Sequence, residues 1–211
     1  VLTLGENTIT ANQTPDDEQY AYEFINWSNM PESGKITGAV TLYANFSRTP
    51  VDHTISFVTN GGSIVDSITQ GYGTEVTEPA KPTKTGHAFK NWYSDADLTS
   101  EFNFSGYTMP ANDVVVYVGW TVNQYTTHFN TNGGNEIGSV TQDYDSTIIK
   151  PSDPEKTGHA FAGWFSDGEL TTSYTTWKMP ANDITIYAKW TVNQYSFSYN
   201  TDGGSIIESH M

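Results

Sequence analysis

The alternation of apolar and polar residues is the strongest local pattern in this chain. Between positions 184 and 190, Ile, Ile, Ala and Trp occupy every second site, and Thr, Tyr and Lys fill the sites between them. Because successive side chains of a strand point to opposite faces, this pattern predicts a half-buried strand. Positions 114–120 show the same alternation. Positions 125–130, rich in aromatic and β-branched residues, predict a further strand.

Turn-forming residues follow the 125–130 strand directly. The segment 131–134 reads Thr-Asn-Gly-Gly, which is a hairpin turn signal. We therefore expect a second strand near 136–149 to fold back on the first. Pro151 and Pro154 then end this ladder, because proline has no amide hydrogen to donate.

The remaining pattern is one further strand and one polar stretch. Residues 161–165 predict a short strand, and residues 166–172 predict a helical turn with Asp167 near its start, where a carboxylate is favoured. No segment has the long amphipathic periodicity of a surface helix. Since a unit of about 70 residues without disulfides is near the lower limit for folding alone, we expect Trp and Phe rings to supply much of its core.

The chain also repeats itself. The block 57–62 returns at 129–134 and 199–204, so that Gly133 lies 72 residues after Gly61 and 70 residues before Gly203. Three further pairs of blocks recur in the same order, at 84–89 and 156–161, at 109–113 and 179–183, and at 121–125 and 191–195. A fixed period of this kind is typical of a tandem array of small domains.

These blocks predict the domain organisation. Residues 1–50 are a divergent or partial repeat, residues 51–122 and 123–192 are full repeats, and residues 193–211 are the opening strand of a further repeat or the end of an expressed fragment. Each full repeat is expected to fold by itself. Because no Gly, Ser or Pro linker separates them at 121–125, the last strand of one repeat should lead directly into the first strand of the next.

Composition narrows the possible functions. The chain has 9 Lys and Arg against 24 Asp and Glu, a formal net charge of -15, which disfavours binding to nucleic acid or anionic membranes. It has no cysteine, which excludes disulfides, cysteine-ligated zinc and cysteine nucleophiles. No apolar run is long enough to span a membrane, and no signal peptide opens the chain, so we expect no membrane insertion in this segment.

The motifs together resemble a known family. The chain carries Asn-Gly-Gly at 132–134, a Pro-x-x-Pro-x-Lys-x-Gly-His-x-Phe-x-Gly-Trp-Phe run at 151–165, Met-Pro-Ala-Asn-Asp at 179–183 and Tyr-Ala-Lys-Trp at 187–190. This order of motifs is similar to that of the Listeria–Bacteroides repeat, also called the internalin B-repeat type. The resemblance covers both full repeats closely and residues 1–50 loosely.

The resemblance implies a fold and a setting. It implies an α+β, predominantly β module that is β-grasp-like (ubiquitin-like), arranged in linear arrays on exported bacterial or archaeal proteins. His87 and His159 stand where Tyr is usual, and Asn91 stands where Gly is usual, before Trp92. The family carries no catalytic residues, so the resemblance transfers none.

The polar residues that could form a site lack the necessary partners in sequence. His87 and His159 have no second His or Cys at metal-ligand spacing, and are interpreted as structural or exposed. Two carboxylate pairs, Asp95 with Asp97 and Asp167 with Glu169, recur in surface loops, whereas glycosidases need carboxyl groups facing each other across a cleft. The segments Ser94-Asp95-Ala96-Asp97 and Asp202-Gly203-Gly204 fall short of a Ca²⁺ loop. We therefore assign no catalytic, cofactor-binding or metal-binding residue.

Aromatic rings and sequons remain as candidate features. Four indole rings could stack on sugars; they are Trp92, Trp120, Trp164 and Trp190. Their fixed place in the repeat, and the inward phase of Trp120 and Trp190, favour the core instead. Four asparagines lie in Asn-x-Ser/Thr sequons, which matter only in a host that glycosylates them; they are Asn12, Asn26, Asn45 and Asn103.

Two functions remain open from the sequence. The first is a non-enzymatic spacer or stalk in an extracellular, cell-surface or wall-attached adhesin, monomeric, in contact with other repeats of the same chain and with a host-cell or cell-wall protein or glycan. The alternative is an array of carbohydrate-binding modules on an exported protein. An enzyme is disfavoured because no polar constellation lies outside the repeated blocks.

Overall fold

The computed structural model describes residues 2–4, 7–11, 15–31, 38–198 and 202–204. Within them the chain forms only strands, which make two four-stranded and two two-stranded sheets. The chain divides into two compact units, one of residues 1–83 with 89–120 and the other of residues 84–88 with 121–211. A predominantly β fold is thus confirmed, and the described residues contain no helix.

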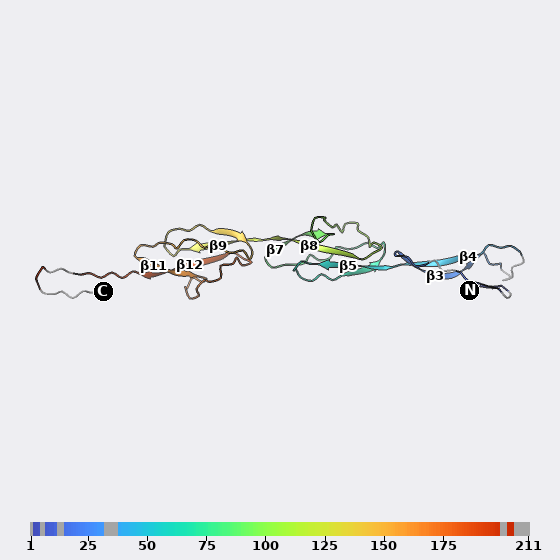
Figure 1. The fold of residues 1–211 in the computed structure, drawn as a ribbon, viewed down its shortest axis with the longest axis horizontal. Helices are drawn as coiled ribbons and strands as arrows, with labels where there is room; N and C mark the ends of the chain where they lie inside the picture. Colours follow the sequence, from blue (N-terminus) through green and yellow to red (C-terminus); the bar gives the residue numbers. More distant parts are fainter. Residues whose placement is uncertain (1, 5–6, 12–14, 32–37, 199–201, 205–211) are drawn as a thin grey trace. The chain divides into compact units, whose positions relative to one another are not determined.

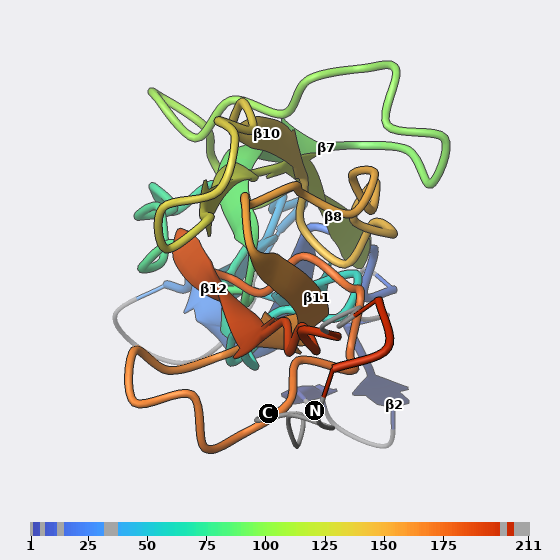
Figure 2. The same ribbon diagram turned by 90° about the vertical axis from the view of Figure 1, so that its left-hand side faces the viewer.

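The second unit contains a mixed four-stranded sheet in the order β10-β9-β12-β11. Its strands are β9 (Gln124–Asn130), β10 (Val140–Asp143), β11 (His159–Phe165) and β12 (Ile184–Val192). The two central strands, β9 and β12, run parallel, and each has an antiparallel outer neighbour. Figures 1 and 2 show β11 lying alongside β12, as the register between them requires.

The first unit repeats this arrangement in the order β6-β5-β8-β7. Its strands are β5 (Asp52–Val58), β6 (Ile68–Gly71), β7 (His87–Tyr93) and β8 (Val114–Val122). The first two residues of β7 and the last two of β8 belong to the second unit. The parallel pair has the same register in both sheets, since Phe57 lies opposite Val116 and Phe129 lies opposite Ile186. The two copies therefore share topology as well as sequence blocks.

An aspartate fixes the start of each parallel pair. The backbone N–H of Thr126 donates to Oδ1 of Asp183 at 2.7 Å, and that of Thr54 donates to Oδ1 of Asp113 at 2.8 Å. Each aspartate ends a Met-Pro-Ala-Asn-Asp block and stands directly before its strand. The block thus ties two segments that are more than fifty residues apart in the chain.

The alternation read from the sequence corresponds to burial in each unit. The core residues of the first unit are Ile55, Val76, Trp92, Phe104, Met109, Val116 and Val118. Those of the second unit are Phe129, Trp164, Ile186 and Ala188, with Phe161 and Trp190 packed against them. Burial of these rings and aliphatic chains is the main stabilising contribution in domains of this size.

The described strands of the first fifty residues form two two-stranded sheets. Strands β1 (Leu2–Leu4) and β2 (Asn7–Ile9) pair antiparallel, as do β3 (Tyr20–Ser28) and β4 (Tyr43–Pro50). The β3–β4 register shifts between Phe24 and Asn26, and the β11–β12 register shifts at the equivalent place, between Phe161 and Gly163. The two strand pairs thus share an irregularity, and the assignment of residues 1–50 as a divergent copy stays a prediction.

Three local expectations are corrected by the structure. The strand expected at 136–149 covers only 140–143, and it pairs with the beginning of β9, so the 131–134 turn does not close the ladder directly. The helical turn expected at 166–172 is wrong: the segment is a loop of bends and turns. Its carboxylate, that of Asp167, accepts the backbone N–H groups of Thr171 and Thr172 and thereby closes the loop without a helix.

The ends of the repeats are described only in part. β8 ends at Val122 and β9 begins at Gln124, so a single residue separates the two strands. The described residues 193–198 belong to no strand. The terminal Ser209-His210-Met211 lies outside the described residues.

Candidate functional site

The Thr-Asn-Gly-Gly turn of the second unit is held by three side-chain hydrogen bonds. Nδ2 of Asn132 donates to the carbonyl oxygen of Ala188 at 2.8 Å, and Oγ1 of Thr131 donates to that of Gly134 at 3.1 Å. The indole Nε1 of Trp190 donates to the carbonyl oxygen of Thr131 at 2.8 Å. We call this arrangement the turn clamp. It fastens the turn after β9 to the neighbouring strand β12.

Backbone conformation and space explain the two glycines of the turn. Asn132 and Gly133 have φ angles of 49° and 86°, in the left-handed region where Asn and Gly are favoured. At Gly134 the reason is steric, because a Cβ atom there would lie 2.6 Å from Cζ2 of Trp190. The turn therefore needs Gly where the indole ring packs against the backbone.

Lys156 joins the repeated Lys-Thr-Gly-His block to the turn clamp. Its Nζ donates to the carbonyl oxygen of Asn132 at 2.7 Å and lies 5.8 Å from the centroid of the Trp190 ring. In the same block, Nδ1 of His159 lies 2.9 Å from the carbonyl oxygen of Thr157. Both side chains therefore support the loop that precedes β11.

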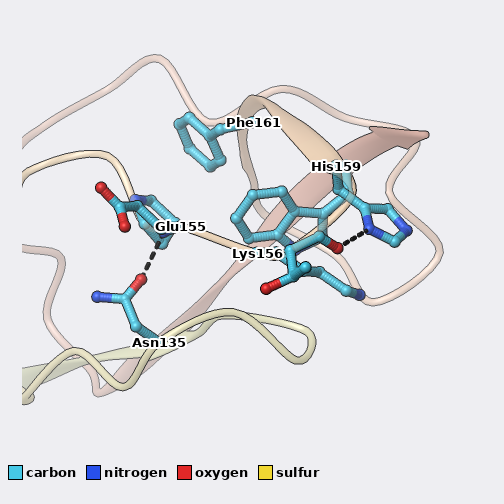
Figure 3. Close-up of a pocket in the computed structure, with 8 residues that line it drawn as sticks. Asn135, Glu155, Lys156, His159 and Phe161 are labelled. Atoms are coloured by element: carbon cyan, nitrogen blue, oxygen red, sulfur yellow. Dashed lines mark hydrogen bonds between the residues drawn. The ribbon is translucent and has the colours of Figure 1, made fainter. Parts of the chain in front are cut away.

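A cavity of about 450 Å³ opens beside the turn clamp (Figure 3). Its walls combine two aromatic rings with polar and charged side chains; the lining residues are Asn135, Pro154, Glu155, Lys156, Thr157, His159, Phe161 and Trp190. The side-chain oxygen of Asn135 accepts the backbone N–H of Glu155, which holds the two sides of the cavity together. In Figure 3 the carboxylate of Glu155 and the imidazole of His159 lie well apart, so they do not form an acid–base pair.

The first unit has the same turn clamp with different residues beside it. Nδ2 of Asn60 donates to the carbonyl oxygen of Val118 at 2.8 Å, and Nε1 of Trp120 donates to that of Thr59 at 2.8 Å. Ser63 and Thr83 occupy the positions of Asn135 and Glu155. The clamp is common to both copies, whereas the polar rim of the cavity differs between them.

The candidate carboxylates serve their own loops. The backbone N–H of Thr171, followed by that of Thr172, holds the pKa of the Asp167 carboxyl below its usual range, and the backbone N–H groups of Thr99 and Ser100 lower the pKa of Asp95 in the same way. Both oxygens of each carboxylate are therefore occupied by backbone donors. The carboxylates of Asp95 and Asp167 therefore close their own loops.

The tryptophans divide into two classes. Trp92 and Trp164 are 2% and 4% exposed, and Trp120 and Trp190 are partly buried members of the turn clamps. Nε1 of Trp92 donates to Oε1 of Glu78 at 2.9 Å. Nε1 of Trp164 is buried and has no hydrogen-bond partner among the described residues. Trp92 and Trp164 are thus core residues, whereas the Trp190 ring also lines the cavity.

The remaining candidate groups have structural partners. His87 lies with its Nδ1 2.8 Å from the carbonyl oxygen of Thr85, in the manner of its equivalent in the second unit. Nδ2 of Asn45 donates to Oδ1 of Asn26 at 2.8 Å across the β3–β4 pair, and Oδ1 of Asn103 accepts the N–H of Ser105 at 2.9 Å. Asn12 lies outside the described residues.

Metal-binding clusters and membrane-spanning helices are both absent from the described ranges. No group of three or more His, Cys, Asp or Glu side chains there could hold a metal ion. No helix in the same ranges is long and apolar enough to cross a membrane.

Comparison with known proteins decides the family. The model of the Listeria-Bacteroides repeat domain matches residues 53–118 and again residues 125–189. The chain belongs to this family. The two matches contain most of both four-stranded sheets and both Thr-Asn-Gly-Gly turns, and they end just before the clamp residues Trp120 and Trp190.

The relatives of this repeat protein are longer chains, and it matches a part of each. It is 41% identical over 172 residues to a putative Gly-rich membrane protein of Evansella cellulosilytica, covering 81% of this chain and 20% of that protein. It is 39% identical over 169 residues to a putative membrane protein of the same organism, covering 80% and 25%. It is 31% identical over 198 residues to Internalin H of Listeria monocytogenes, covering 90% and 34%. The chain thus spans only a fifth to a third of the length of these relatives.

Sequence reasoning identified the repeated blocks but missed the roles of several residues in them. Lys156, Asp183 and Gly134 each make a contact that holds the fold, and Glu78 accepts a bond from a buried indole. Their recurrence at fixed block positions was the available signal for the first three. Nothing in the sequence marked Glu78, because the equivalent position of the second copy is Lys150.

Proposed function

We propose that this chain is a non-enzymatic structural segment of an exported surface protein, in which the repeats act as a spacer that holds other domains away from the cell. The turn clamp, present in both copies with the same partners, is the observation that carries this proposal. If the repeated blocks formed a functional site, their polar side chains would be free to contact a ligand. In this structure the polar side chains of the clamp bind backbone carbonyl oxygens instead. We infer that the repeated residues maintain the folded module.

Two further features support a spacer. One residue, Asn123, separates β8 from β9, and a connection this short without glycine restricts hinge motion. The net charge of -15 favours solubility and repels anionic surfaces. The names of the relatives, Internalin H and two putative membrane proteins, support a location at the cell surface or wall.

Small-angle scattering of the full chain tests the spacer. A single globule of 211 residues would have a radius of gyration of about 17 Å. We expect a clearly larger value and a distance distribution with a long tail, because units that gain length as an array contact only their neighbours. A particle with the dimensions of one globule would contradict the proposal, as would hydrolase activity that maps to these residues.

The cavity beside Trp190 favours a second candidate, which is binding of a glycan or protein surface. Its walls pair aromatic rings with the polar side chains of Asn135 and Glu155. The double substitution Asn135→Ser with Glu155→Thr converts this rim to that of the first unit, where Thr83 N–H donates to Oγ of Ser63 at 3.0 Å. Glycan-array binding that this variant abolishes, with unchanged melting, would establish the second candidate; absence of binding by the parent chain would end it.

We also propose the finer organisation expected from the sequence. The full repeats 51–122 and 123–192 are taken as the modules, each a β-grasp-like sheet whose two antiparallel hairpins are joined through a central parallel pair, and the chain is taken as a monomer. The mixed order of the sheets supports this. Limited proteolysis that released fragments ending near Asn123 would test the boundaries, and cleavage within β5 or β9 would argue against them.

A further inference from the structure

One turn of the second compact unit is covered by an aromatic ring. Residues 84–88 belong to this unit together with the chain from Thr121 onward. The ring of Tyr144 lies against Gly86 so closely that a Cβ atom there would overlap it. The same ring meets His87 edge-on, with centroids 5.8 Å apart and planes at 75°. Gly86 is buried as a result.

Backbone hydrogen bonds place Tyr144 at this turn. The N–H of Asn123 donates to the carbonyl oxygen of Gly86 at 2.9 Å, and the N–H of Tyr144 donates to that of Asn123 at 2.8 Å. The two bonds connect the turn, the start of β9 and the residue after β10 in series. The position of the ring is therefore fixed by backbone geometry as well as by ring contact.

A second aromatic ring of the chain has an equivalent position. Tyr72 lies 72 residues before Tyr144, and its N–H donates to the carbonyl oxygen of Val51 at 2.8 Å, as that of Tyr144 does to Asn123. Within the first unit its ring packs edge-on against Tyr20, at 5.5 Å between centroids. Tyr20 is the first residue of β3. When β3 and β11 are aligned on the register shift that both contain, the start of β3 corresponds to the turn that precedes β11. In both cases the tyrosine covers the entrance of an antiparallel hairpin.

The turn at 157–159 has the same construction but an uncovered face. Gly158 has a φ of 73°, against 68° for Gly86, and its carbonyl oxygen accepts the N–H of Asn193 at 2.9 Å. Nδ2 of Asn193 lies 3.3 Å from the hydroxyl of Tyr195, which reproduces the bond between Asn123 and Tyr125. A Cβ atom at Gly158, however, would meet nothing within 4 Å.

We propose that the Thr157–His159 turn is a docking socket for the tyrosine-bearing hairpin of a further copy of this repeat. The occupant is a repeat that carries an aromatic residue where this chain has Tyr72 and Tyr144. The backbone bond from Asn193 to Gly158 is already formed and would position that hairpin. The glycine provides a flat surface without a side chain, and the His159 ring provides an edge-on aromatic contact. The proposal concerns recognition between repeats and holds whether or not the array acts as a spacer.

The test compares the two glycines in two chains. In the parent chain we expect Gly86→Ala to lower the Tm more than Gly158→Ala, because similar φ angles give both the same strain and only Gly86 faces a ring. An extended chain, in which a second copy of residues 123–192 follows Val192, supplies the occupant. In the extended chain, the decrease in Tm caused by Gly158→Ala should be several degrees larger than in the parent chain, and should equal the decrease caused by Gly86→Ala. Replacing the tyrosine of the added copy by Leu should cancel this difference between the chains.

Proton NMR of the unsubstituted chains gives a readout that does not depend on stability. A ring packed on a glycine shifts its Hα resonances upfield, so Gly86 should show this shift in the parent chain. Gly158 should show it only in the extended chain, and not when the added tyrosine is Leu. Unshifted Gly158 resonances in the extended chain, or an unchanged loss from Gly158→Ala, would overturn the proposal.

Discussion

At the residue scale, the spaces around single side chains explain which residues recur. Gly62 and Gly134 are required by the indole rings of the turn clamps, because a Cβ atom at either position would overlap or crowd a tryptophan. The buried indole N–H groups differ between the two units, because atoms at equivalent positions have different hydrogen-bond partners. Nε1 of Trp92 has a carboxylate acceptor, and Nε1 of Trp164 has none among the described residues.

Gly134→Ala should destabilise the second unit by about 1–3 kcal/mol, because the added methyl group forces Trp190 or the backbone of Glu155 to move. Gly138→Ala is the matched control. Its Cβ would meet nothing within 4 Å, so its free energy of unfolding should stay within about 0.5 kcal/mol of the parent. Urea unfolding followed by tryptophan fluorescence measures both. Equal stability of the two variants would show that the clamp is loosely packed.

The difference between the two indole N–H groups predicts opposite effects on stability for two substitutions. Glu78→Ala leaves Nε1 of Trp92 without an acceptor and should cost about 1–3 kcal/mol. Lys150→Glu places a carboxylate at the equivalent position of the second unit and should stabilise that unit by about 1 kcal/mol. Lys150→Ala is the control for losing the Lys150 contact with Trp177, whose centroid lies 5.8 Å from Nζ. Thermal unfolding of the three variants measures the effects, and a Lys150→Glu variant no more stable than Lys150→Ala would contradict the expected bond.

At the scale of elements, long-range contacts set the order of strands. β9 and β12 are parallel neighbours although the whole of β10 and β11 lies between them in sequence. A parallel pair cannot be closed by a tight turn, so its register needs another device. Asp183 supplies it by accepting the N–H of Thr126, one residue before the first paired residues, Ile184 and Thr127.

Asp183→Ala should therefore weaken the start of the parallel pair and lower the free energy of unfolding by about 1–2 kcal/mol. Asp153→Ala removes the same charge from an exposed loop site and should have little effect. Hydrogen exchange gives the local readout, with faster exchange expected for Thr126 in the first variant alone. Unchanged protection of Thr126 would mean that the carboxylate does not hold the strand.

At the scale of the whole molecule, two separate cores determine stability. One is built around Trp92 and the other around Trp164, and each contains buried residues from its own four-stranded sheet. Units of this size have little stability in reserve, so the loss of one large ring should unfold a unit completely.

Trp164→Ala should cost about 3–5 kcal/mol and unfold the second unit. The backbone resonances of the first unit around Trp92 should remain those of a folded protein in a proton–nitrogen correlation spectrum. Trp92→Ala is the reciprocal variant, in which the second unit should persist. Loss of both sets of resonances in either variant would show a single cooperative fold.

The sequence by itself determined the local and periodic features of this protein. Alternation of side chains showed the strands at 114–120 and 184–190, because the period of a strand is a property of the backbone. The order and spacing of the blocks indicated the repeat family, which the family model confirms over residues 53–118 and 125–189. Neither result requires knowledge of which segments lie side by side in space.

Only the tertiary structure decided how those segments combine. It placed β9 beside β12, shortened the expected second strand to 140–143, and replaced the expected helical turn by a loop closed on Asp167. It also showed that Asn132 and Trp190 hold a turn, where sequence left a sugar-binding role open for the tryptophan. For the parallel pair and the turn clamp the physical reason is that they depend on contacts between residues more than fifty positions apart, whose partners a local pattern does not specify. The extent of β10 depends on its pairing with β9, and the Asp167 loop forms because backbone N–H groups that a helical turn would leave free donate to the carboxylate.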